Sequence, residues 1–131
     1  LLSQMSAVAV VQAGFAVAII ASAGLWLMWG QGAAVGFALT VAASLGIVQG
    51  ASFASLAELN PSADDRAMGA GAIAQLGNLG TTTGTPMLVW ALDRAGVTGL
   101  AVFLVGFSAL GITIHALQAR RRISALSRHP R

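Results

Sequence analysis

Uncharged polar residues inside the long apolar stretches of the chain include five candidates for a site, because polar groups there are costly and usually turn toward other helices or water. At about 100° per helical residue, Gln75, Asn78 and Thr82 share one narrow face, and Gln49 and Ser52 lie about 60° apart on another helix. Amides and hydroxyls form hydrogen bonds without carrying charge. We therefore predict that these residues line a cavity for a neutral or amphipathic solute. The alternative is that they hold neighbouring helices together.

A charged loop follows the second apolar stretch. Pro61 is expected to end the preceding helix, and the Ser62-x-x-Asp65 pattern is typical of the start of the next one. Glu58 and Arg66 can pair across the loop. The alternative is that these two charges are simply solvated, in which case they contribute little to stability.

A proline and two glycine pairs indicate how the helices bend and pack. Pro86 lies within an apolar stretch and removes a backbone donor there, which predicts a bend. Gly46-x-x-x-Gly50 and Gly80-x-x-x-Gly84 place two glycines on one helix face, which allows neighbouring backbones to approach closely. We expect both pairs to lie at helix contacts.

The elements that carry these residues are four apolar stretches, at residues 5–28, 34–56, 67–90 and 100–117, none of which contains a charged side chain. Each is close to the roughly 20 residues that an α-helix needs to cross a bilayer. The chain is 56% hydrophobic and 8% charged, too few charges for a soluble domain. The sequence predicts an all-α membrane protein with four transmembrane helices in residues 1–118.

Orientation follows from the arginines, because positively charged flanks stay in the cytoplasm. Arg66 lies in the second loop and five arginines follow the last stretch, whereas only Arg94 lies in the third loop. Both termini are therefore expected in the cytoplasm, with residues 119–131 as a basic tail on anionic lipid rather than on nucleic acid. Three residues at the opposite ends of the helices fit an aromatic belt: Trp26, Trp29 and Trp90.

Enzyme chemistry is not indicated. The chain has no cysteine and only two histidines, so disulfides, thiolate sites and a metal site built from protein side chains are not expected. His115 is either a proton-relay group or, in the preferred interpretation, an interfacial residue near the arginines. A membrane hydrolase would need a base beside its nucleophile, and a phosphate loop at residues 69–84 lacks a lysine. No cofactor is predicted.

The pattern Glu58-Leu-Asn-Pro61, then Arg66 and later Gln75-Leu-Gly-Asn78, resembles the last four helices of the major facilitator superfamily (MFS). The resemblance implies that the chain supplies the ninth to twelfth helices of a twelve-helix secondary carrier in the bacterial inner (plasma) membrane. It implies a small-molecule substrate, with proton coupling as one option, and partner helices from the missing N-terminal part of the same transporter. The tenth and eleventh helices would line the cavity, and the ninth and twelfth would be peripheral.

Two other classes of membrane protein are considered. A small four-helix multidrug exporter would need a buried carboxylate, normally in the first helix, and residues 5–28 contain no acid. A small structural or assembly protein would need only glycine-rich helices that pack well. The opening Leu1-Leu2-Ser3, which lacks a methionine, predicts that the chain continues upstream. Transport assays with the flanking sequence would separate a carrier from an assembly protein.

Overall fold

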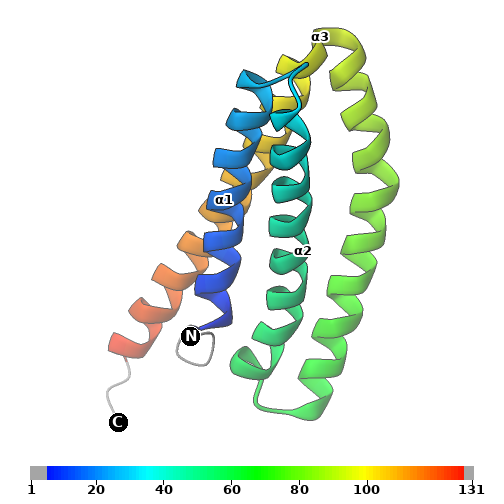
Figure 1. The fold of residues 1–131 in the computed structure, drawn as a ribbon. Helices are drawn as coiled ribbons and strands as arrows, with labels where there is room; N and C mark the ends of the chain where they lie inside the picture. The colour runs from blue at the N-terminus through cyan, green and yellow to red at the C-terminus, as the bar shows by residue number, and fades with distance from the viewer. Residues whose placement is uncertain (1–5, 129–131) are drawn as a thin grey trace.

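The computed structural model describes residues 6–128, and that part of the chain is helical apart from short connections (Figure 1). The helices are α1 (Ala7–Leu27), α2 (Ala33–Leu59) and α3 (Ala63–Arg128). All three are long and apolar enough to cross a membrane. The all-α class is therefore confirmed, and the apolar helices are compatible with an integral membrane protein. The predicted first residue of the first helix, Met5, lies outside the described residues.

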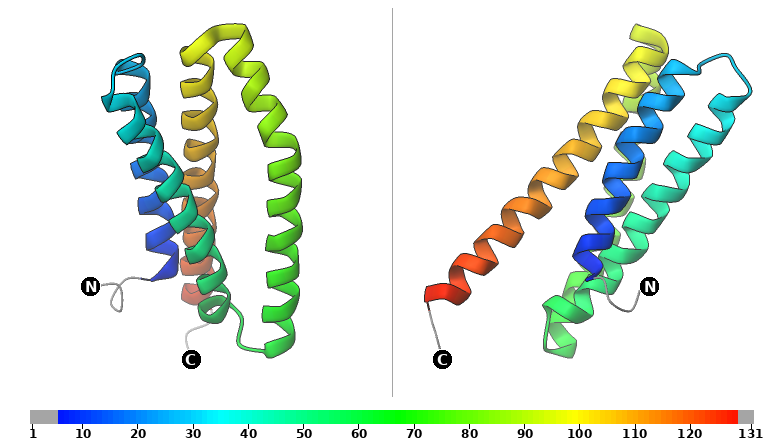
Figure 2. Two further views of the ribbon diagram at one scale, coloured as in Figure 1. Left: turned by 45° about the vertical axis from the view of Figure 1, so that its right-hand side comes forward. Right: turned by 60° about the vertical axis from the view of Figure 1, so that its left-hand side comes forward.

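The structure has three helices where the sequence analysis predicted four, because the last two predicted helices form one helical hairpin. Within α3, Ala95 has φ −136° and ψ 16°, and Gly96 has φ 57° and ψ −147°. The positive φ at Gly96 is a conformation that glycine adopts without steric cost. The chain reverses there, so α3 has a first arm (residues 63–94) and a second arm (residues 97–128) that run in opposite directions (Figures 1 and 2).

Helix ends follow local capping. α2 ends at Leu59, and Asn60 is extended, as expected for a residue before proline. α3 begins at Ala63, four positions before the predicted start at 67, because Ser62 already caps it. The second arm stays helical through Arg128, so the predicted tail, residues 119–131, begins as helix. Residues 129–131 lie outside the described part.

The core is centred on α1, which lies between α2 and the second arm (Figure 2). Its inward face carries mostly small side chains; Val11, Ala18 and Ser22 are at most 1% exposed. Small residues let helix backbones approach closely, as membrane packing requires. Among the segments of this chain, α1 is therefore the central helix. Its expected peripheral place in a twelve-helix carrier stays a prediction.

Close helix contacts occur at other glycines than the predicted pairs. A Cβ on Gly14 would lie 2.6 Å from Val48 Cγ2, and a Cβ on Gly24 would overlap the ring of Phe37. By contrast, Cβ atoms on Gly46 and Gly50 would meet no atom within 4 Å. The predicted contact at Gly46–Gly50 is absent within the described residues, because this pair lies on the side of α2 that faces away from α1.

Candidate functional site

The first arm of α3 carries its polar face away from the other segments. Gln75, Asn78 and Thr82 are all exposed. Gly84 and Met87, together with residues on the same side of the arm, line a pocket that α1, α2 and the second arm also border. At about 100° per residue, this inward side lies about 180° from the polar face. The three polar candidates therefore point out of the bundle.

The two candidates on α2 do not join that polar face. Gln49 is exposed, whereas Ser52 is half-buried and its hydroxyl donates a 2.7 Å hydrogen bond to the carbonyl oxygen of Val48. A serine bonded in this way is satisfied by its own helix. Ser52 therefore needs no further partner, and Gln49 presents its amide outward.

The structure does not bring the five cavity candidates into one site. The pocket between α1, α2 and the two arms of α3 is lined by none of them. The predicted glycine pair of the first arm, Gly80 and Gly84, does face this pocket, but Cβ atoms there would meet nothing within 4 Å. This pair therefore borders open space and makes no close helix contact. A cavity lined by the polar candidates would need surfaces beyond these four segments.

The charged loop is ordered by different partners than predicted. The carboxylate of Glu58 accepts hydrogen bonds from the backbone N–H of Ala7, at 2.9 Å to Oε1 and 3.2 Å to Oε2. These bonds satisfy an orphan donor at the N-terminus of α1 and place negative charge at the positive end of its dipole. Among the described residues no ion pair joins Glu58 to Arg66. The predicted pairing is therefore replaced by a cap.

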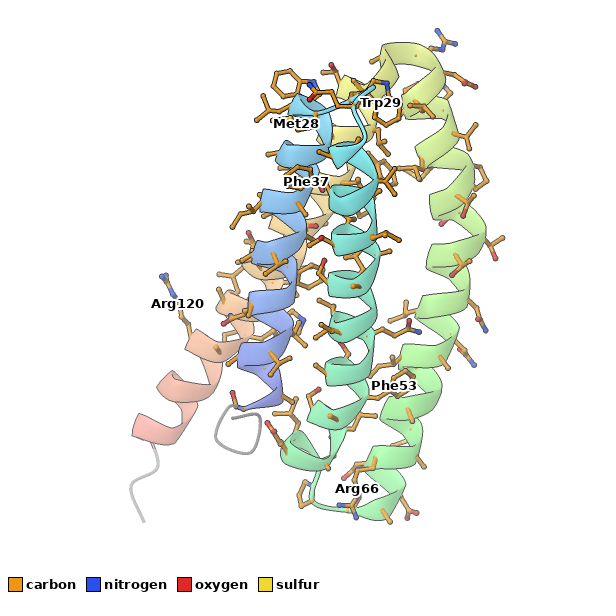
Figure 3. All side chains as sticks on the ribbon, in the orientation of Figure 1. Met28, Trp29, Phe37, Phe53, Arg66 and Arg120 are labelled. Atoms are coloured by element: carbon orange, nitrogen blue, oxygen red, sulfur yellow. The ribbon has the colours of Figure 1, made fainter. Side chains whose placement is uncertain are left out.

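The start of α3 has the predicted capping pattern. The backbone N–H of Asp65 donates to Ser62 Oγ at 3.0 Å, and the Ser62 hydroxyl donates to Asp65 Oδ2 at 2.6 Å. Pro61 precedes this cap and follows the extended residue Asn60. The loop is therefore a tight, hydrogen-bonded turn at one end of the bundle, where Figure 3 shows Arg66.

Pro86 lies inside the first arm without interrupting it. Non-helical backbone angles occur within α3 only at Ala95 and Gly96. Figure 1 shows the first arm curving gently along its length, and the sharp reversal comes at the glycine. The first arm therefore stays helical through Pro86, where a bend was predicted, and the chain reverses only at Ala95 and Gly96.

Aromatic residues gather at the end of the bundle opposite Arg66, where Figure 3 shows Trp29. Trp26 Nε1 donates a 3.0 Å hydrogen bond to Thr98 Oγ1, which ties the end of α1 to the start of the second arm. The guanidinium of Arg94 lies 5.9 Å from the ring centroid of Trp90, within cation–π range. This end therefore has the amphipathic composition of a membrane–water interface.

His115 packs into the bundle and is half-buried. Its ring centroid lies 6.3 Å from that of Phe15 on α1, and the Phe15 ring in turn covers Gly111. His115 thus contacts a neighbouring helix, and its interpretation as an interfacial residue stays a prediction. No group of three metal-ligating side chains occurs in the described part of the chain.

Two polar features were not predicted. One is the cap of Glu58 on Ala7, whose partners are 51 positions apart in the chain. The other is Ser108, which is 3% exposed and lines the pocket. Ser108 follows Phe103 and Phe107 on the same helical arm. Their spacing indicates that the three side chains lie toward one side of the arm, but it does not indicate which helix packs against that side.

Comparisons with protein-family models, curated proteins and solved structures found no match.

Proposed function

We propose that the chain is part of an MFS-type secondary carrier and that the polar face of its first arm lines the solute path. The observation that carries the proposal is the outward direction of Gln75, Asn78 and Thr82 on an arm whose opposite side faces the bundle. In this proposal the chain supplies the ninth to twelfth helices of the carrier. The missing N-terminal helices of the same transporter close the cavity from the other side.

Membrane energetics support this role. Amides that face hydrocarbon lose hydrogen bonds to water, and a polar side chain within a span therefore faces protein or a water-filled cavity. The large apolar side chain of Leu79, at 59% exposed, flanks the polar face on the same arm. The first arm thus combines an apolar surface for lipid or partner helices with the narrow polar face.

The proposed topology has four crossings. At about 1.5 Å per residue, the 66 residues of α3 would extend roughly 100 Å as a straight rod, about three times the thickness of a hydrocarbon core. The reversal at Gly96 divides it into two arms that each suit one crossing. With the Arg66 end in the cytoplasm, both termini are cytoplasmic and the tryptophans lie outside.

The solute is proposed to be a small uncharged or amphipathic molecule, because the polar face offers amides and hydroxyls without charge. The acidic residues Glu58, Asp64, Asp65 and Asp93 all lie near helix ends. Proton coupling, if the carrier uses it, therefore depends on groups outside these residues.

Cysteine labelling tests the proposal, since the chain contains no cysteine of its own. Asn78→Cys and Gly80→Cys lie at nearly the same depth on opposite sides of the first arm. In membranes holding the protein in its complete reading frame, we expect a charged, membrane-impermeant methanethiosulfonate to label Asn78→Cys much faster, because thiolates form in water. Equal or absent labelling at both positions would contradict a water-filled path.

A small assembly protein is the second candidate. It is favoured by the open surface at Gly46 and Gly50, where added Cβ atoms would meet nothing within 4 Å and another helix can approach. Under this alternative the polar face would bond to a partner helix and stay unlabelled in the cysteine experiment.

A further inference from the structure

A pocket of about 390 Å³ lies where all four helical segments meet. Phe15 of α1 and Leu45 of α2 form two sides, Met87 closes it from the first arm, and Phe103 and Phe107 border it from the second arm. No charged side chain lines it. Its size is at the small end of the roughly 300–1,000 Å³ typical of ligand sites, and its apolar lining is also typical of them.

One hydroxyl in this pocket lacks a partner. The buried serines of α1 and α2, Ser22 and Ser44, donate to carbonyl oxygens of their own helices at 2.7 and 2.9 Å. Ser108 is equally buried, at 3% exposed, yet its hydroxyl makes no hydrogen bond with a described residue. Among those residues no fully enclosed side-chain oxygen or nitrogen is unsatisfied. The hydroxyl of Ser108 therefore keeps some exposure, and Ser108 is one of the residues that line the pocket.

The remaining walls suit a flat apolar ring. Phe103 and Phe107 lie with ring centroids 4.7 Å apart and planes tilted by 40°. Gly80 and Gly84 form the opposite wall, and added Cβ atoms there would meet no atom within 4 Å, so this wall leaves room for a guest. The Thr83 hydroxyl already donates to the carbonyl oxygen of Leu79 at 2.8 Å. Ser108 is therefore the pocket's free hydrogen-bonding donor.

We propose that this pocket binds a small, uncharged, largely apolar molecule that carries one hydroxyl, with its ring against Phe103 and Phe107 and its hydroxyl on Ser108. A pure hydrocarbon guest, such as a lipid acyl chain, fills the same space but leaves the Ser108 hydroxyl unpaired, which costs free energy in a dry site. The pocket lies on the side of the first arm opposite the polar face. This site is therefore separate from the proposed solute path and does not depend on it.

Photocrosslinking tests the proposal directly. The probe is 4-(hydroxymethyl)benzophenone, and benzophenone itself is the matched probe without a hydroxyl. With the whole chain in lipid nanodiscs, we expect mass spectrometry to place the crosslink of the alcohol probe at Met87. Loss of one hydrogen bond in Ser108→Ala should weaken its apparent affinity about fivefold, while benzophenone is unaffected.

A filling variant provides the second readout. Gly84→Leu places a side chain into the open wall and should abolish Met87 crosslinking by both probes, whereas Gly46→Leu, on the outer side of α2, should leave it unchanged. Helical circular dichroism checks that each variant folds, and if Gly84→Leu does not fold, the Ser108→Ala comparison decides alone. Equal crosslinking of wild type and Ser108→Ala by the alcohol probe would overturn the proposal, as would Met87 crosslinks that persist in a folded Gly84→Leu.

Discussion

Replacing Gly14 by alanine tests how closely α1 and α2 pack. A Cβ at this position would lie 2.6 Å from Val48 Cγ2 and 3.2 Å from the carbonyl oxygen of Ser44. Valine in a helix is held in one strongly preferred rotamer, so its methyl group cannot swing aside. The carbonyl oxygen belongs to the backbone of α2. The two helices must therefore move apart, which loosens the contacts around the buried residue Val11.

The size of the effect follows from two opposing terms. Overpacking costs about 1–3 kcal/mol, while glycine to alanine within a helix gains up to about 1 kcal/mol from helix propensity. Gly46→Ala is the matched control, because its Cβ meets no atom within 4 Å and the propensity gain is similar. The difference between the free energies of unfolding of the two variants therefore cancels the gain from helix propensity. The free energy of unfolding of Gly14→Ala should therefore fall about 1–3 kcal/mol below that of Gly46→Ala.

Unfolding in mixed micelles, followed by helical circular dichroism as sodium dodecyl sulfate is added, measures this difference. Val48→Ala removes the methyl group that the new Cβ meets, so the double variant Gly14→Ala/Val48→Ala should show a favourable coupling between the two sites. Equal stabilities of Gly14→Ala and Gly46→Ala, or additive effects in the double variant, would show that α1 and α2 are not in contact at Gly14.

Substitutions at Glu58, Ser62 and Gly96, each with a matched comparison variant, test the turns and caps by the same unfolding assay. Glu58→Ala removes both acceptors of the Ala7 N–H and should lower the free energy of unfolding by about 0.5–2 kcal/mol. Glu58→Gln should lose less, because it keeps one acceptor oxygen. Equal losses in the two variants would argue against the cap. Ser62→Ala should cost about 1 kcal/mol, and Ser62→Asn should restore most of it; no rescue would exclude a capping role. Gly96 has φ 57° and ψ −147°, so Gly96→Ala should lower the free energy of unfolding by about 1–3 kcal/mol. Gly106→Ala should not, because a Cβ there meets no atom within 4 Å. Similar losses in the two variants would refute the turn with positive φ at Gly96.

The helices were predictable because apolar length and capping are local signals. The runs at 34–56 and 67–90 fall within α2 and the first arm, and Ser62 caps α3 as its spacing with Asp65 indicated. The reversal at Gly96 was predicted as a loop between two separate helices. It is only two residues long, so helical structure continues almost unbroken on either side.

The contacts between helices were not predictable from the same signals. A glycine pair shows that the side chains on one helix face are small, but it does not show whether another helix covers that face. The helix contact was therefore predicted at Gly46 and Gly50, whereas the structure has a close contact at Gly14. The Glu58 carboxylate reaches the start of α1 only because α1 and α2 are antiparallel neighbours. The direction of the polar face at Asn78 likewise depends on which side of the first arm meets the bundle.

Two-sided labelling of Asn78→Cys is the most direct test of the central claim, that the polar face of the first arm lines a path for solute. The protein would be expressed in its complete reading frame and exposed to an impermeant methanethiosulfonate in sealed vesicles of each orientation. A carrier that alternates its access predicts that the thiol reacts from both sides of the membrane. A thiol that reacts from one side only, or from neither, would contradict that claim.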